Sequence, residues 1–157
     1  MTPPGSIPPD AGATGAPVAP VKALIVTHGH LGEALLGAAQ AITGPSADLD
    51  TMSNVGLSRD QLVALVAERV AAFGPRGGLV FADVLGGSCA QAALAAAAGR
   101  APGPVRVLCG VNLAMVLDYL HNRTRLEPAA LADHVLARGR AAVQLLEAKT
   151  VEPGSTM

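Results

Sequence analysis

Aromatic side chains are scarce in this sequence of 157 residues. They make up 2% of the chain, as one Tyr, two Phe and no Trp, which leaves almost no surface on which single-stranded bases can stack. Lys and Arg number 11 and Asp and Glu 12, so the formal net charge is -1. A chain without excess positive charge lacks the electrostatic signature of a nucleic-acid binder. We therefore expect no nucleic acid among its partners.

Cysteines and long apolar runs are scarce as well. The two cysteines, Cys89 and Cys109, are too few for a disulfide scaffold, which favours a reducing, cytoplasmic compartment. No uninterrupted apolar run in the sequence reaches the roughly 18–20 residues of a membrane-spanning helix, so we expect no direct insertion into a membrane. Half of the residues are hydrophobic, which argues against disorder of the whole chain.

Composition divides the chain into a short N-terminal tail and one folded unit. Residues 1–20 contain six of the twelve prolines and a single charged residue, Asp10; this composition predicts a disordered tail. Residues 149–157 predict a flexible C-terminus. The stretch between them, residues 21–148, has a length that suits one domain. Because the sequence ends at Met157, we expect a free-standing domain with no second domain after it.

Short apolar runs alternate with helical patterns along residues 21–148. Runs rich in β-branched residues predict buried strands, and apolar residues at helical spacing predict helices between them. Gly44-Pro45 and Gly74-Pro75 each end a helix, and Ser58 with Gln61 predicts a capping box at the start of another. The predicted strands cover residues 21–26, 49–52, 78–82 and 105–109. The predicted helices cover about residues 31–42, 58–73, 89–98, 113–121 and 128–147.

This alternation predicts an α/β fold, a doubly wound, about four-stranded parallel sheet with helices on both faces. Continuously apolar strands are typical of sheets that are buried on both sides. The 31 alanines of the chain suit helices that pack closely on such a sheet. Ligands bind these sheets beyond the carboxyl ends of the strands. The residues directly after each strand are therefore the first candidates for a functional site.

Polar residues and glycines follow three of the four predicted strands. The segments are Thr27-His28-Gly29-His30, Asp83 with Gly86-Gly87-Ser88, and Asn112. A carboxylate at Asp83 can hold the proton on one ring nitrogen of His28 and leave the other nitrogen nucleophilic. Glycines before a helix N-terminus favour anions, phosphate in particular. The combination predicts phosphoryl chemistry on His28.

Each of these residues also has a purely structural explanation. Ser88 can be a helix N-cap, Asp83 a helix cap or a turn residue, and His30 a helix-start residue near the site. His121 and His134 fall on predicted helices, and we assign them structural roles. No spacing of His, Cys, Asp or Glu in the sequence indicates a metal site, so none is expected.

Three segments resemble the mannose-type enzyme IIA component of the bacterial phosphoenolpyruvate-dependent sugar phosphotransferase system. They are residues 23–29, 83–88 and 110–115, in the family's order and at comparable spacing, and the resemblance covers about residues 21–147. It implies a doubly wound homodimer that exchanges an extra C-terminal antiparallel strand. It also implies a phosphohistidine carrier that accepts a phosphoryl group from HPr and passes it to a IIB protein.

The resemblance assigns roles residue by residue. His28 corresponds to the phosphorylated histidine, modified on Nε2, and Asp83 to the carboxylate that orients it. The expected phosphate-binding residues are Gly29, Gly86, Gly87 and Ser88, and the expected rim residues are Thr27, His30 and Asn112. No cofactor is implied, because the phosphoryl group is carried covalently on His28. Cys89 departs from the family, in which proline often follows the Gly-Gly-Ser segment.

Three alternatives stay open at the level of sequence. A regulator on the same fold would use phosphorylation of His28 as a signal that a partner reads. The phosphocarrier subunit that feeds dihydroxyacetone kinase shares the fold and the N-terminal histidine, but its later motifs differ. A hydrolase is the third, because residues 86–90 approximate a nucleophile elbow around Ser88. Its acid and histidine would come from Asp118, Asp133, His121 or His134, although residues 84–87 separate Ser88 from its strand.

Overall fold

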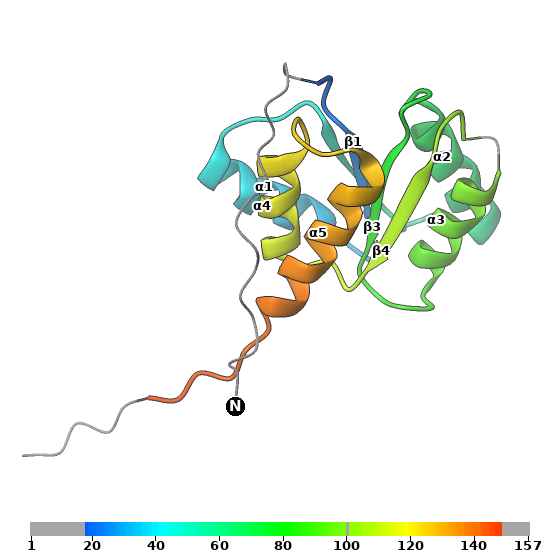
Figure 1. Cartoon of the computed structure of the whole chain (residues 1–157). Helices are drawn as coiled ribbons and strands as arrows, with labels where there is room; N and C mark the ends of the chain where they lie inside the picture. Colours follow the sequence, from blue (N-terminus) through cyan, green and yellow to red (C-terminus); the bar gives the residue numbers. More distant parts are fainter. Residues whose placement is uncertain (1–17, 100, 149–157) are drawn as a thin grey trace, which may run out of the picture.

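A computed structural model describes residues 18–99 and 101–148 (Figure 1). These residues form four strands and five helices: β1 (Lys22–Thr27), α1 (Leu31–Thr43), β2 (Leu49–Ser53), α2 (Arg59–Ala71), β3 (Gly78–Ala82), α3 (Ser88–Ala98), β4 (Val105–Cys109), α4 (Leu113–Asn122) and α5 (Pro128–Ala141). No helix in this part of the chain has the length and apolarity to cross a membrane. Most of the predicted N-terminal tail and all of residues 149–157 lie outside the described residues.

The sheet is parallel throughout, with the strand order β2-β1-β3-β4. Helices α1, α4 and α5 cover one face, and α2 and α3 cover the other (Figure 1). From β1 the chain moves to β2 on one side, and then crosses to β3 on the other side of β1. The carboxyl ends of β1 and β3 therefore form the topological switch point, where such sheets bind ligands. The doubly wound parallel fold predicted from the sequence is confirmed.

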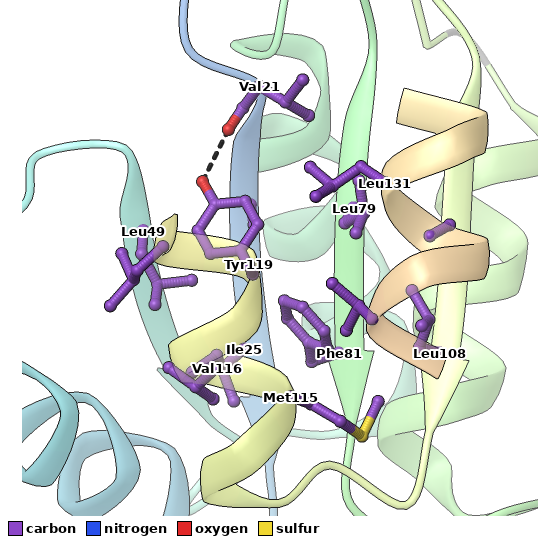
Figure 2. Packing of buried hydrophobic residues seen from close by; sticks show 14 of the residues in the cluster. Val21, Ile25, Leu49, Leu79, Phe81, Leu108, Met115, Val116, Tyr119 and Leu131 are labelled. Carbon is purple, nitrogen blue, oxygen red and sulfur yellow. Dashed lines mark hydrogen bonds between the residues drawn. The ribbon is translucent and has the colours of Figure 1, made fainter. Parts of the chain in front are cut away.

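Two of the three aromatic side chains form the centre of the core beneath α1, α4 and α5. Phe81 on β3 and Tyr119 on α4 meet edge to face, with ring centroids 5.9 Å apart (Figure 2). The hydroxyl of Tyr119 donates to the carbonyl of Val21 at 2.6 Å, which ties α4 to the start of β1. Burial raises the pKa of Tyr119, so the phenol keeps the proton that this hydrogen bond needs.

On the opposite face of the sheet, helix α3 contributes only small residues to the core. The residues that α3 buries are Cys89, Ala90, Ala92, Ala93 and Ala96, and they pack with the apolar face of α2 and one side of the sheet. Helix α2 begins with the predicted capping box: the hydroxyl of Ser58 accepts from the N–H of Gln61 at 3.2 Å, and the N–H of Ser58 donates to Oε1 of Gln61 at 2.9 Å. The capping box predicted for α2 is therefore confirmed, and the alanine-rich helix α3 packs on the sheet as the composition predicts.

The largest boundary difference lies at the C-terminal end of α5. This helix ends at Ala141, not at Glu147 as the sequence predicts. Residues 143–148 are exposed and have no regular structure, because within the described part of the chain nothing covers Val143, Leu145 or Leu146. Residues 18–99 and 101–148 contain no fifth strand, so the exchanged C-terminal strand stays a prediction.

Candidate active site

His28 and Asp83 meet where β1 and β3 end. Nδ1 of His28 lies 2.9 Å from Oδ2 of Asp83 and 3.1 Å from Oδ1. The backbone N–H of His28 donates to Oδ2 at 3.0 Å, and that of Val84 donates to Oδ1 at 2.9 Å. The Asp83 side chain is 8% exposed and the His28 side chain 45%. The carboxylate is therefore held in place by two backbone N–H groups, while the imidazole that it contacts is open to solvent.

The charge of Asp83 determines which nitrogen of His28 carries the proton. Burial opposes ionisation of this carboxyl, but the backbone N–H and the ring of His28 outweigh burial and hold the pKa of Asp83 below its ordinary value. An ionised carboxylate can only accept hydrogen bonds, so we assign the proton of the neutral imidazole to Nδ1. Nε2 then keeps its lone pair and is the ring atom that is able to act as a nucleophile.

Nε2 of His28 faces the first turn of α3. Oγ of Ser88 lies 3.4 Å from it. Gly87 takes the N-cap position of α3, so Ser88 is the first helical residue and not the cap. The first N–H groups of a helix have no acceptor within the helix, and in α3 they belong to Ser88, Cys89 and Ala90. The nucleophilic nitrogen thus lies beside a hydroxyl and the positive end of a helix.

The glycine turn before α3 brings the backbone close to the His28 ring. Gly86 has a φ of 78°, which glycine adopts without the strain that a side chain would add. A Cβ on Gly87 would lie 3.2 Å from Cε1 of His28, so the turn approaches the ring because Gly87 has no side chain. The N–H of Gly87 donates to the carbonyl of Val84 at 3.1 Å. In this structure Gly87 therefore contributes close approach and does not offer a free donor.

Asn54 supports the turn that follows β1, and the sequence reasoning did not single it out. Its Oδ1 accepts the N–H of Gly29 at 3.2 Å, and its own N–H donates to the carbonyl of Thr27 at 3.2 Å. Gly29 has a φ of 56°, so it supplies the left-handed turn while its N–H is bound within the protein. The signal for Asn54 was its position two residues after the predicted strand 49–52; in the structure it directly follows β2, which ends at Ser53.

The three predicted rim residues lie in different environments. Thr27 is fully buried, and its hydroxyl accepts an N–H from the first turn of α1 at 2.8 Å. His30 is exposed, and its ring lies 3.1 Å from the carboxylate of Glu33 on α1. Asn112 caps α4, and its amide donates to the carbonyl of Gly139 in α5 at 3.3 Å. Thr27 and Asn112 therefore hold helices in place, and His30 projects from the surface.

Cys89 is a further neighbour of the His28 ring. Its side chain is buried, and Sγ lies 3.9 Å from Nδ1 of His28. Burial and the negative charge of Asp83 raise the pKa of this thiol, which does not favour a nucleophilic thiolate.

Ligand atoms of His28, Asp83 and Cys89 lie within 4.8 Å of one another, a grouping suited to a metal ion. Sequence spacing did not indicate this group, because folding brings its members together from separate segments.

A second histidine–aspartate pair joins α4 to α5. Nδ1 of His134 lies 2.7 Å from Oδ2 of Asp118, and Nε of Arg138 lies 3.5 Å from Oδ1 of the same carboxylate. Nδ2 of Asn122 donates to Oδ1 at 3.2 Å. This arrangement is consistent with the structural role predicted for His134. It also means that Asp118 and His134, two of the four residues named for a hydrolase, contact each other, whereas Ser88 contacts His28.

Solved structures of phosphotransferase components resemble this chain. The component EIIA from Streptococcus agalactiae superposes with a TM-score of 0.74 at 25% identity, covering 79% of this chain and 95% of that one. The mannose/sorbose-specific IIA subunit from Enterococcus faecalis gives 0.73 at 24%, covering 85% and 100%. The IIA protein associated with the fucose utilization operon of Streptococcus pneumoniae gives 0.69 at 14%, covering 83% and 96%, a likeness of fold alone. No curated protein sequence matches the chain.

A family model agrees with these structural likenesses over most of the folded unit. The model is EIIA-man, described as the fructose IIA component of the phosphotransferase system, and it matches residues 22–136. This range runs from β1 into α5 and includes His28, Asp83 and the glycine turn. On the fold, the site and this match together, the chain belongs to the EIIA-man family of phosphotransferase-system IIA components.

Proposed function

We propose that this chain is a phosphohistidine carrier that accepts a phosphoryl group on Nε2 of His28 from an HPr-type phosphocarrier and passes it to a IIB protein. The observation that carries the proposal is the environment of one imidazole. Asp83 contacts its Nδ1 at 2.9 Å, while Ser88 lies beside Nε2. Asp83 orients the ring, and Ser88 at the start of α3 provides donors for phosphate oxygens.

The proposed transfer is a displacement between two imidazoles. The lone pair on Nε2 of His28 attacks the phosphorus of the donor phosphohistidine, and an N–P bond forms on His28. The donor N–P bond breaks, and its electron pair stays on the donor nitrogen. Asp83 stabilises the positive charge that develops on the His28 ring through the Nδ1 proton. A second displacement by a nucleophile of the IIB protein removes the phosphoryl group. No cofactor enters the scheme, because the group is held covalently.

The surroundings of Nε2 suit this chemistry, because phosphoryl transfer depends on positioning and charge stabilisation. The hydroxyl of Ser88 and the first N–H groups of α3 are the proposed donors to the phosphoryl oxygens. Val84 and Leu85, in the loop between β3 and α3, are exposed apolar residues beside the site. We propose that these two side chains belong to the surface on which the partner proteins dock, since a carrier needs a surface that each partner can leave again.

The match to the EIIA-man model favours the sugar phosphotransferase system over the dihydroxyacetone kinase alternative. A hydrolase needs a separate test, because Ser88, His28 and Asp83 also have the connectivity of a Ser-His-Asp triad. A fluorophosphonate probe for serine hydrolases should leave Ser88 unmodified if the chain is a carrier. Stoichiometric modification of Ser88 would favour the hydrolase.

The carrier is tested by mixing the chain with phosphoenolpyruvate, enzyme I and HPr, and measuring acid-labile phosphate on it. We expect stoichiometric labelling of the wild type and none of His28→Ala. His134→Ala is the matched control, since it removes the imidazole of the second pair, and it should label like the wild type. Labelling of His28→Ala would contradict the assignment. The labelled chain is then mixed with a IIB protein. Loss of the phosphoryl group to that protein indicates a transport carrier, whereas a regulator stays phosphorylated.

We further infer that the chain acts in the cytoplasm as a homodimer. The resemblance implies exchange of a C-terminal strand, and the exposed residues Val143, Leu145 and Leu146 directly after α5 support this. Within the described residues, β4 pairs with β3 alone, so its other edge can accept a strand from a second copy. Sedimentation should give a dimer for the wild type and a monomer for the double variant Leu145→Ser/Leu146→Ser. An unchanged dimer would contradict the exchange.

A further inference from the structure

We propose that His28, Asp83 and Cys89 form a binding site for one zinc ion, and that zinc bound there prevents His28 from accepting a phosphoryl group. Zinc binding follows from the geometry of the three side chains and does not depend on the phosphocarrier role. The inhibitory effect rests on the proposed function.

Two of the three separations between the ligand atoms are already close to those that zinc requires. Zinc bonds of about 2.0–2.3 Å to nitrogen, oxygen and sulfur in a tetrahedron place the ligand atoms roughly 3.4–3.6 Å apart. Nδ1 of His28 lies 2.9 Å from Asp83 Oδ2 and 3.9 Å from Cys89 Sγ. These two separations need to change by about half an ångström. All three ligand atoms lie within 4.8 Å of one another, and the half-exposed His28 ring is the member that can move.

Two of the three ligands are held in place by the backbone. Two backbone N–H groups hold the Asp83 carboxylate by hydrogen bonds. Cys89 is fixed because it is buried in the first turn of α3. Imidazole, thiolate and carboxylate are the usual zinc ligands, and three protein ligands leave a fourth position for water. On binding, the Cys89 thiol proton leaves to solvent, and the thiolate and carboxylate together neutralise the charge of the ion.

Zinc and phosphoryl acceptance compete through the tautomer of His28. Zinc takes the lone pair on Nδ1, so the single proton of the neutral imidazole moves to Nε2 through solvent. Nε2 then has no lone pair with which to attack phosphorus. In the accepting state the reverse holds, because the Nδ1 proton points to Asp83 and leaves no position for the ion. Cys89 is the residue that adds zinc affinity to an otherwise ordinary histidine–aspartate pair.

Cobalt(II), which takes tetrahedral sites and absorbs light, tests binding without any phosphoryl transfer. We expect the full-length chain to bind one Co²⁺ with a thiolate-to-cobalt band in the near ultraviolet, and zinc to displace it. Cys89→Ser and Cys89→Ala should each lose this band and bind Zn²⁺ at least about 10-fold more weakly. Cys109→Ser, the matched control, should keep both. No band in the wild type, or a band that survives in both Cys89 variants, would overturn the site.

Inhibition is measured as labelling by purified phospho-HPr with zinc divided by labelling without it. We expect this ratio to approach zero for the wild type and to stay near one for Cys89→Ser at the same zinc concentration. A wild-type ratio near one despite bound metal would overturn the inhibitory role. Absent labelling without zinc would instead refute the phosphocarrier function and leave the cobalt result standing, so the two failures are distinguishable.

Discussion

Two histidine–aspartate pairs in this molecule share nearly the same local geometry. The distance from Nδ1 to the carboxylate oxygen is 2.9 Å for His28 and Asp83, and 2.7 Å for His134 and Asp118. Both carboxylate side chains are 8% exposed, and the imidazoles are 45% and 37% exposed. Neither distance nor burial therefore distinguishes His28, the proposed phosphoryl acceptor, from a histidine with a structural role.

The surroundings distinguish the two pairs. His28 and Asp83 follow parallel strands at the switch point, with Ser88 and the N-terminus of α3 beside the free ring nitrogen. Asp118 and His134 lie within α4 and α5, and Asp118 also contacts Arg138. The carboxylate orients an imidazole in both places. Strand ends and a helix N-terminus add the open space and the donors that a phosphoryl group needs.

The largest difference between the pairs should appear when each aspartate is changed to asparagine. An asparagine at position 83 presents one oxygen and one NH₂, so it cannot accept both backbone N–H groups that now bind Asp83. We expect Asp83→Asn to slow phosphoryl transfer from phospho-HPr by at least about 100-fold. Asp118→Asn should change the rate by less than about twofold. Rapid quench measures both, and equal slowing would show that the effect is structural.

A smaller effect is expected at Ser88, which has its hydroxyl beside Nε2. Ser88→Ala removes one hydrogen bond to a charged phosphoryl group, worth about 1.5 kcal/mol, and should slow transfer roughly 10-fold. The control is Ser58→Ala, which removes the cap of α2 and should cost about 1 kcal/mol of stability without changing the rate of the folded protein. Complete loss of labelling in Ser88→Ala would contradict a supporting role.

The smallest effect concerns stability and pH. Because the pKa of Asp83 is lowered in the folded protein, its ionised form stabilises the fold at pH values above the ordinary aspartate pKa of about 3.9. That contribution is lost as pH falls through the lowered value. Urea unfolding should therefore show the stability gap between the wild type and Asp83→Asn narrowing below about pH 4. A gap that stays constant down to pH 2 would show that the ionised carboxylate contributes nothing to it.

Much of the site was predictable because strand ends carry a simple positional signal. His28, Asp83 and Ser88 each follow a strand in sequence, and folding brings them within hydrogen-bond distance. The rim was less predictable: Thr27 also ends a strand, but it points inward and holds α1. Whether a residue at a strand end faces solvent or the core depends on the packing of the next helix, which residue type does not specify.

Local patterns determined the elements, and tertiary packing determined how they are used. The capping box at Ser58 and the apolar strands follow from short-range hydrogen bonding and hydrophobicity, so the sequence alone predicts them. The contact of Asn54 with Gly29 and the approach of Cys89 to His28 depend on distant segments. Helix α5 ends at Ala141, where the apolar residues that follow have no packing partner in the described part of the chain. Burial and proximity are properties of the assembled layers, because two residues sixty positions apart become neighbours only when the strands that precede them align in one sheet.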